Sequence, residues 1–161
     1  MKGQFVFFIA LFVLLTIGLL FLLRCSKHPF EKYLANRDFS RIYKITRQTV
    51  VNVEFEEKRR DTFRFLKGGR FIFETWGINV YFSQPWSLIV RLKGKYKVQP
   101  IEGRPSRAKL ILFIKKGVNR EGMFAQSISK KREERIFWFE KDNPRILYIQ
   151  NKDKVFEYHS R

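Results

Sequence analysis

Residues 5–23 form an unbroken run of 19 uncharged and almost entirely apolar residues. As an α-helix this run would extend about 28 Å at ~1.5 Å per residue, close to the hydrocarbon thickness of a bilayer. A secretory signal peptide has a shorter apolar stretch and small residues before its cleavage site, whereas this run ends in Leu22-Leu23 followed by Arg24. The sequence therefore predicts a retained transmembrane helix, or signal-anchor, within residues 1–25.

Cys25, the one cysteine of the chain, follows this predicted helix directly. Leu22 stands three residues before it, which resembles the lipobox of bacterial lipoproteins, although Arg24 occupies the position of the usual small residue. The resemblance implies a lipidated Cys25. The alternative, favoured by Arg24, is a free thiol at the interfacial end of the helix. Both interpretations place the chain at a membrane.

Residues 26–161 carry 31 Lys and Arg against 15 Asp and Glu, a formal net charge of +16. They also include 22 aromatic residues, enough to fill a core, so we expect one folded domain. With one cysteine and two histidines in the chain, the sequence predicts no disulfide, no metal site and no cofactor.

Alternation of apolar and polar residues is the main structural signal of this domain. After a connector over residues 26–40, with a helical turn or two from Pro29, such alternation predicts strands with one face in the core. Gly68-Gly69 lies between two of these runs and predicts a tight hairpin. Residues 100–106 read as a loop, and three short runs after residue 135 read as a meander.

Residues 41–161 are therefore predicted to be all-β: a single antiparallel sandwich or small barrel of about eight or nine strands, behind one N-terminal transmembrane helix. Residues 123–134 are expected to form a long loop or a polar strand pair. We expect Trp76 and Trp138 in the core, and Trp86, in the Gln84-Pro85-Trp86 turn, at the surface.

Catalysis has little support in this sequence. The histidines, His28 and His159, lie beside the predicted anchor and two residues before Arg161, and no glycine-rich phosphate loop is present. We therefore expect a protein that is not an enzyme.

Clusters of basic residues are the strongest functional candidates, because such density attracts phosphates and other anions. The alternative is a solvated surface in which lysines protect sheet edges. Lys93, Lys95 and Lys97, at alternate positions of a predicted strand, fit that alternative. The residues predicted to bind an anionic ligand are Lys115, Lys116, Arg120, Lys130, Lys131, Arg132, Arg135 and Trp86.

Together these features predict a membrane-anchored binding or assembly module at the cell envelope. Its partner would be an anionic lipid head group, an envelope polymer or a protein. The first alternative is a membrane-tethered cytosolic protein that binds nucleic acid, and the second is an envelope hydrolase without a recognisable motif. Basic residues after the apolar run favour a cytosolic domain, but long domains translocate largely regardless of charge. We expect a single-pass protein with the domain on the outer side, and the cytosolic orientation stays open.

Overall fold

The computed structural model describes residues 12, 13, 16, 29–48, 53–79, 85–121, 125–140 and 143–160. Of the apolar run, this includes only Phe12, Val13 and Thr16, which are helical. The rest of the predicted anchor, and Cys25, lie outside the described residues. Within the described part of the chain, no helix has both the length and the apolar character needed to cross a membrane.

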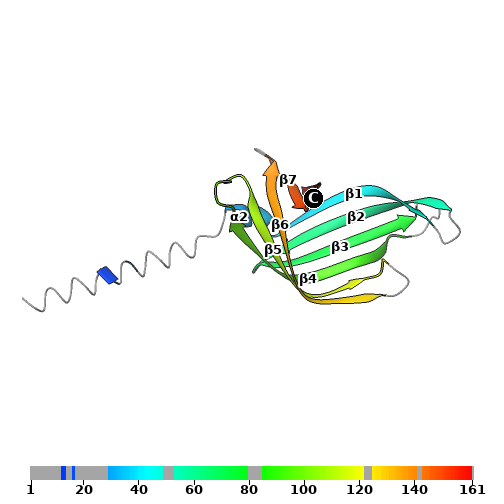
Figure 1. The fold of residues 1–161 in the computed structure, drawn as a ribbon, viewed down its shortest axis with the longest axis horizontal. Helices are drawn as coiled ribbons and strands as arrows, with labels where there is room; N and C mark the ends of the chain where they lie inside the picture. The colour runs from blue at the N-terminus through cyan, green and yellow to red at the C-terminus, as the bar shows by residue number, and fades with distance from the viewer. Residues whose placement is uncertain are drawn as a thin grey trace, which may run out of the picture.

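A short helix and eight strands follow one another in the described residues (Figure 1). They are α2 (Pro29–Leu34), β1 (Arg37–Gln48), β2 (Glu54–Leu66), β3 (Arg70–Asn79), β4 (Ser87–Pro100), β5 (Ala108–Asn119), β6 (Gln126–Glu140), β7 (Asn143–Asn151) and β8 (Lys154–Ser160).

Each strand pairs antiparallel with the next, and the sheet closes into a barrel in the order β1 to β8. Two residue pairs close it, Phe39 with Ser160 and Ser40 with His159. The all-β prediction is confirmed, and of the two predicted architectures the small barrel is the one that forms. The closure is short, because β1 pairs with β8 at these two positions and β6 pairs with β7 only from Ile136, so the rest of β1 and the first part of β6 have a partner on one side.

The hairpin predicted at Gly68-Gly69 is the connection between β2 and β3. Both glycines have positive φ, 74° and 66°, the backbone conformation that glycine adopts without a steric penalty. The turn sets the register of the pair, so that Phe63 lies opposite Phe73 and Phe65 opposite Phe71. These facing aromatic residues begin the core.

The barrel interior is filled mainly by Phe, Leu, Ile and Tyr side chains. Phe39, Phe63, Phe65 and Phe137 are fully buried there. Because the side chains of a strand alternate between faces, each strand contributes every second residue to this interior.

Helix α2 packs against one end of the barrel. Its Leu34 is fully buried in the core cluster, and its Phe30 ring lies 5.6 Å from the ring of Phe137. Figure 1 shows α2 beside the connection from β4 to β5, so we call this the α2 end. The Gly68-Gly69 turn lies at the same end, because Arg37 at the start of β1 pairs with Phe65 near the end of β2.

Two expectations about boundaries concern β6 and β1. Residues 123–134 were expected to form a long loop or a polar strand pair, and of the two the structure has a polar strand: β6 begins at Gln126 and pairs with β5 as far as Phe137. The long β5 ladder supplies the hydrogen bonds that hold this polar segment in the sheet. In addition, β1 begins at Arg37, within residues 26–40, where the connector was expected.

The tryptophans also differ from expectation. Trp76 and Trp138, expected in the core, are only half-buried and lie outside the core cluster. Trp138 stacks on Tyr148, with the ring centroids 5.5 Å apart, and Arg107 lies 4.5 Å above its ring. The interior is therefore filled by smaller aromatic rings, and the indoles take part in surface contacts.

Candidate functional site

The strongest candidate site is a groove of about 720 Å³ over β4 and β5, near the Gly68-Gly69 turn. We call it the basic groove. Its lining residues come from the turn, from the second half of β4 and from the middle of β5. They are Gly68, Gly69, Arg70, Lys93, Gly94, Lys95, Tyr96, Lys97, Phe113, Ile114, Lys115 and Lys116.

Local backbone geometry shapes this groove. The ladder between β4 and β5 shifts register between Lys93 and Gly94. At Gly94 the two strands approach so closely that an added Cβ would lie 2.0 Å from the carbonyl oxygen of Phe113. The backbone amide of Tyr96 donates a hydrogen bond of 2.7 Å to the carbonyl of Gly69, which ties the turn to β4. Glycine is therefore required at this close approach of β4 and β5.

The groove combines an apolar surface with positive charge. The Phe113 side chain is 38 % exposed, and Lys95 is its cross-strand neighbour on β4. Lys95, Lys97, Lys115 and Lys116 are exposed around it, and no acidic residue lines the groove. Such a surface can hold an anionic group while its apolar floor contacts a hydrocarbon part of the same ligand.

The lysines of the groove are not neutralised within the described structure. No ion pair joins Lys93, Lys95, Lys97, Lys115 or Lys116 to any carboxylate among the described residues. Their positive potential is therefore available to a ligand.

The basic cluster on β6 is different. Lys131 pairs with Glu133 at 2.9 Å, and Arg132 pairs with Glu134 on the same strand. Arg135 pairs with Glu133 at 2.8 Å and lies over the Phe63 ring, so its guanidinium points into the barrel. Hydrogen bonds from Arg135 and Lys131 lower the pKa of Glu133 even though burial opposes the shift. These cations are partly neutralised by their own strand.

The structure separates most of the predicted binding residues, but Arg132 lies opposite Phe113 in the β5–β6 ladder, with its guanidinium 6.0 Å from the centre of the Phe113 ring. Lys115 and Lys116 lie in the basic groove, whereas Lys130 is exposed on β6 with a positive φ of 48°. Arg120 lies beyond the end of β5, at the opposite end of the barrel. Trp86 is half-buried, with the Arg60 guanidinium 5.0 Å above its ring.

Lys93, Lys95 and Lys97 were interpreted as edge protection, and their place in the groove was missed. β4 pairs with β3 on one side and β5 on the other, so it has no edge. Two sequence patterns belong to this groove: the alternate lysines of β4 and the continuous apolar run of β5. The register of the β4–β5 pair, which sets Lys95 opposite Phe113, brings these two patterns into one surface, and the sequence does not show that register.

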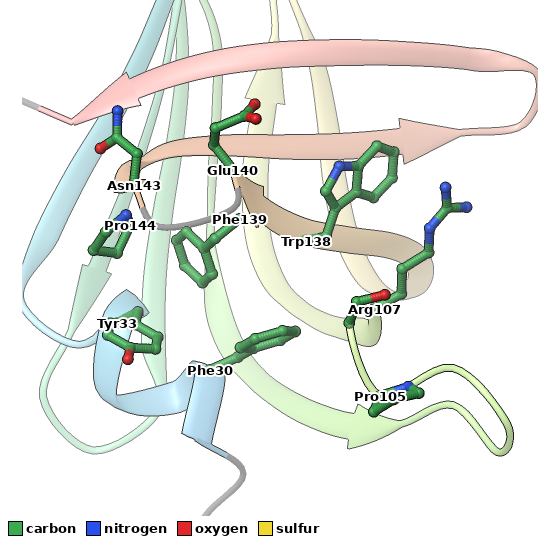
Figure 2. Close-up of a pocket in the computed structure, with 10 residues that line it drawn as sticks. Phe30, Tyr33, Pro105, Arg107, Trp138, Phe139, Glu140, Asn143 and Pro144 are labelled. Carbon is green, nitrogen blue, oxygen red and sulfur yellow. The ribbon is translucent and has the colours of Figure 1, made fainter.

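A second hollow, also of about 720 Å³, lies between α2, the β4–β5 connection and the start of β7. Figure 2 shows Phe30 and Tyr33 of α2 on one side, with Phe139 between them and β7, and with Trp138 and Arg107 farther along. The rings of Tyr33 and Phe139 are 5.5 Å apart. This aromatic hollow lies at the α2 end, where residues 5–23 would connect to the barrel.

Inside the barrel, a group of polar residues lies beyond the aromatic core. The Asp61 carboxylate is 3 % exposed and accepts hydrogen bonds from Arg41 Nη2 at 2.7 Å and from the Thr75 hydroxyl at 2.8 Å. The Arg41 guanidinium also lies over the rings of Phe156 and Tyr158. Burial raises the pKa of the Tyr158 phenol well above its ordinary value, because its charged form would be poorly solvated. This arrangement joins β1, β2 and β3 and is satisfied internally.

Metal binding has no cluster to support it in the described ranges, where no group of three or more His, Cys, Asp and Glu residues could hold an ion.

Comparison of the chain with models of protein families, with curated proteins and with solved structures found no match.

Proposed function

We propose that this protein is a membrane-anchored binding module whose basic groove holds an anionic lipid head group, and that it acts by binding rather than by catalysis. The observation that carries the proposal is the set of five lysines around the exposed Phe113 ring, none of which forms an ion pair within the described part of the chain. A phosphate group would be attracted by the lysines, and the adjoining hydrocarbon would cover the ring.

The position of the groove supports a membrane ligand. The Gly68-Gly69 turn, which lines the groove, is at the α2 end of the barrel. The apolar run at residues 5–23, proposed here as a transmembrane anchor, precedes α2 in the chain. An anchored barrel would therefore present this end to the bilayer, with Tyr33, Arg107 and Trp138 of the aromatic hollow at the depth that Tyr, Trp and Arg favour.

The groove can be tested with two triple variants that remove equal charge. The barrel with α2, residues 29–161, would be mixed with vesicles of phosphatidylcholine alone or with phosphatidylglycerol added, and bound protein measured by co-sedimentation. Lys93/Lys95/Lys97→Gln should lose about a hundredfold in affinity for the anionic vesicles, at about 1 kcal/mol for each lysine near the surface. Lys130/Lys131/Arg132→Gln should lose less, because Lys131 and Arg132 already have partners on β6.

Three outcomes would contradict the proposal. Equal losses in the two variants would mean diffuse electrostatic attraction without a site. Binding to single-stranded RNA, but not to anionic vesicles, would favour the nucleic-acid alternative. Equal binding to neutral and anionic vesicles would exclude the head group as the recognised feature.

The anchor and the orientation need their own experiment. A reporter fused after Arg161 that is active in only one compartment should be active on the outer side of the membrane. Resistance to alkaline carbonate extraction should accompany it, and intact mass would show whether the chain keeps residue 1 or starts at a lipidated Cys25.

A further inference from the structure

A third hollow, of about 280 Å³, lies at the end of the barrel opposite α2. We call it the arginine pocket. It is formed where β1 ends, β2 begins, β3 ends and β4 begins, together with residues 120 and 121 after β5. Its charged lining residues are Arg47, Arg59, Arg120, Glu57 and Glu121.

The two carboxylates in this pocket are already engaged. Glu57 Oε1 accepts a hydrogen bond of 3.0 Å from Arg59 Nε, and Glu57 Oε2 lies 2.7 Å from Arg47 Nε. Glu121 Oε1 accepts hydrogen bonds from Arg47 Nη2 at 2.9 Å and from Arg59 Nη1 at 3.0 Å. Arg47 and Arg59 thus each form ion pairs with both Glu57 and Glu121.

Two donor atoms of these arginines form no hydrogen bond among the described residues. Arg47 Nε lies 2.7 Å from Glu57 Oε2 without forming one, and Arg59, which is 6 % exposed, has a buried Nη2 without a partner. Buried side-chain donors in folded proteins are nearly always paired, so the Arg59 nitrogen is a candidate to bind a ligand. Since a guanidinium stays protonated, Arg59 cannot escape this cost by losing its charge.

Arg120 is a further cation in the arginine pocket. Arg120 lines the pocket and forms no ion pair with any carboxylate in the described ranges. Its backbone amide donates to the carbonyl of Ile89 at 2.8 Å, which fixes the residue beside β4. Three guanidinium groups against two carboxylates leave the lining with one excess positive charge, which a single monoanion would balance.

The backbone at Gly77 makes room for the Glu57 carboxylate in the wall of the pocket. At Gly77 an added Cβ would lie 2.4 Å from Glu57 Oε1 and 2.5 Å from Ile89 Cδ1. The absence of a side chain at this position lets the Glu57 carboxylate, and with it the Arg59 guanidinium, settle close to β3.

We propose that the arginine pocket binds a small oxyanion, a carboxylate or phosphate group, held by Arg59 and Arg120. This site is independent of the basic groove, which lies on the outer surface toward the other end. A guanidinium presents donors in a planar fork that matches carboxylate and phosphate oxygens, so two arginines suffice for a specific site.

The test uses the full chain in non-ionic detergent at constant ionic strength. Inorganic phosphate and acetate would be titrated separately, with binding followed by calorimetry and by the rise in melting temperature that a ligand of the folded state produces. A saturable response to one of the two anions identifies its chemistry. Arg120→Gln, an exposed position that leaves the ion pairs of Arg59 in place, should weaken that response by about tenfold or more.

Two controls make the result specific. Arg104→Gln removes an exposed arginine in the β4–β5 connection, at the other end of the barrel, and should bind the anion like the unaltered chain. Lys93/Lys95/Lys97→Gln should also keep the response, which separates this site from the basic groove. No saturation with either anion, or equal weakening in Arg120→Gln and Arg104→Gln, would overturn the proposal.

Discussion

At the scale of single residues, Gly94 allows β4 and β5 to approach closely in the wall of the basic groove. It is the point where the β4–β5 ladder shifts register, and the Phe113 carbonyl occupies the place that a Cβ would need. This approach exists because Gly94 lacks a side chain, so the stability of the barrel depends on this position.

Gly94→Ala should lower the free energy of unfolding by about 1–3 kcal/mol, because two strands must move apart to admit the methyl group. Urea denaturation measures this loss. Gly103→Ala is the control: its φ is +70°, but nothing lies within 4 Å of the added Cβ, so it reports the backbone strain alone. A larger loss at Gly103 than at Gly94 would contradict the close approach.

Because of Tyr158, we expect the stability of the barrel to fall at alkaline pH. Burial raises the pKa of its phenol above the ordinary value near 10, so above that pH the unfolded chain loses this proton before the folded chain does. The stabilisation that comes from this pKa difference is therefore complete below pH 10 and is lost as pH rises. When pH rises from about 9 to about 11, the free energy of unfolding, measured by urea denaturation, should fall by about 1 kcal/mol less in Tyr158→Phe than in the unaltered chain.

The comparison of these two proteins at neutral pH gives the baseline effect of removing the hydroxyl. Parallel stability curves for both from neutral to alkaline pH would show that Tyr158 ionises with an ordinary pKa in the folded state.

At the scale of elements, α2 is part of the barrel core. Leu34 is fully buried, and Phe30 meets both Phe137 and Phe139 at ring distances of 5.6 Å. The helix is only six residues long and would not be stable alone, so packing against the barrel is what maintains it.

A fragment of residues 29–161 should therefore be more stable than one of residues 37–161. Loss of the buried Leu34 side chain alone is comparable to a large-to-small core substitution, about 2–5 kcal/mol. Both fragments should give a β-rich far-ultraviolet spectrum, and urea denaturation would measure the difference. Leu34→Ala in the longer fragment should reproduce much of it. Equal stability of the two fragments would mean that α2 is not needed to cover this end.

At the scale of the whole molecule, charge is the dominant property. The chain has a formal net charge of +18, and the lysines of the basic groove have no carboxylate partners among the described residues. Self-repulsion should destabilise the compact state at low salt, and it weakens when the separation of charges exceeds the Debye length.

The melting temperature of the 29–161 fragment should accordingly rise by a few degrees as sodium chloride increases from about 10 mM to about 150 mM, where the Debye length falls to about 8 Å. Lys93/Lys95/Lys97→Gln should show a smaller rise, because part of the repulsion is already gone. A melting temperature that falls with salt in this range would indicate that surface ion pairs outweigh the repulsion.

The limits of sequence reasoning are clearest in β1. Its inward positions include Arg41, Tyr43 and Arg47, whereas Ile42 points outward and is 57 % exposed. Phe39 and Ile45 share the inward face, so the apolar alternation of this strand is broken only at Arg41 and Ile42. The inward Arg41 is stable because it meets Asp61 of β2 inside the barrel, a contact between different strands.

Features that depend on neighbouring residues could be predicted from the amino-acid sequence. Alternation around Phe63 and Phe65, the two glycines at 68 and 69 and the loop predicted at 100–106 indicated an all-β domain with a correctly placed hairpin. Strand formation and turn geometry are local, because each is set by backbone conformations within a few residues.

Closure, register and charge pairing, by contrast, are properties of the tertiary structure. Phe39 reaches Ser160 to close the barrel, Lys95 is set beside Phe113, and Arg59 is enclosed with Glu121. Each of these relations joins residues far apart in the chain, and each depends on which face of a strand a side chain occupies. A shift of one residue in register reverses that face, so the surface to which a lysine or arginine belongs is fixed only when all eight strands have paired.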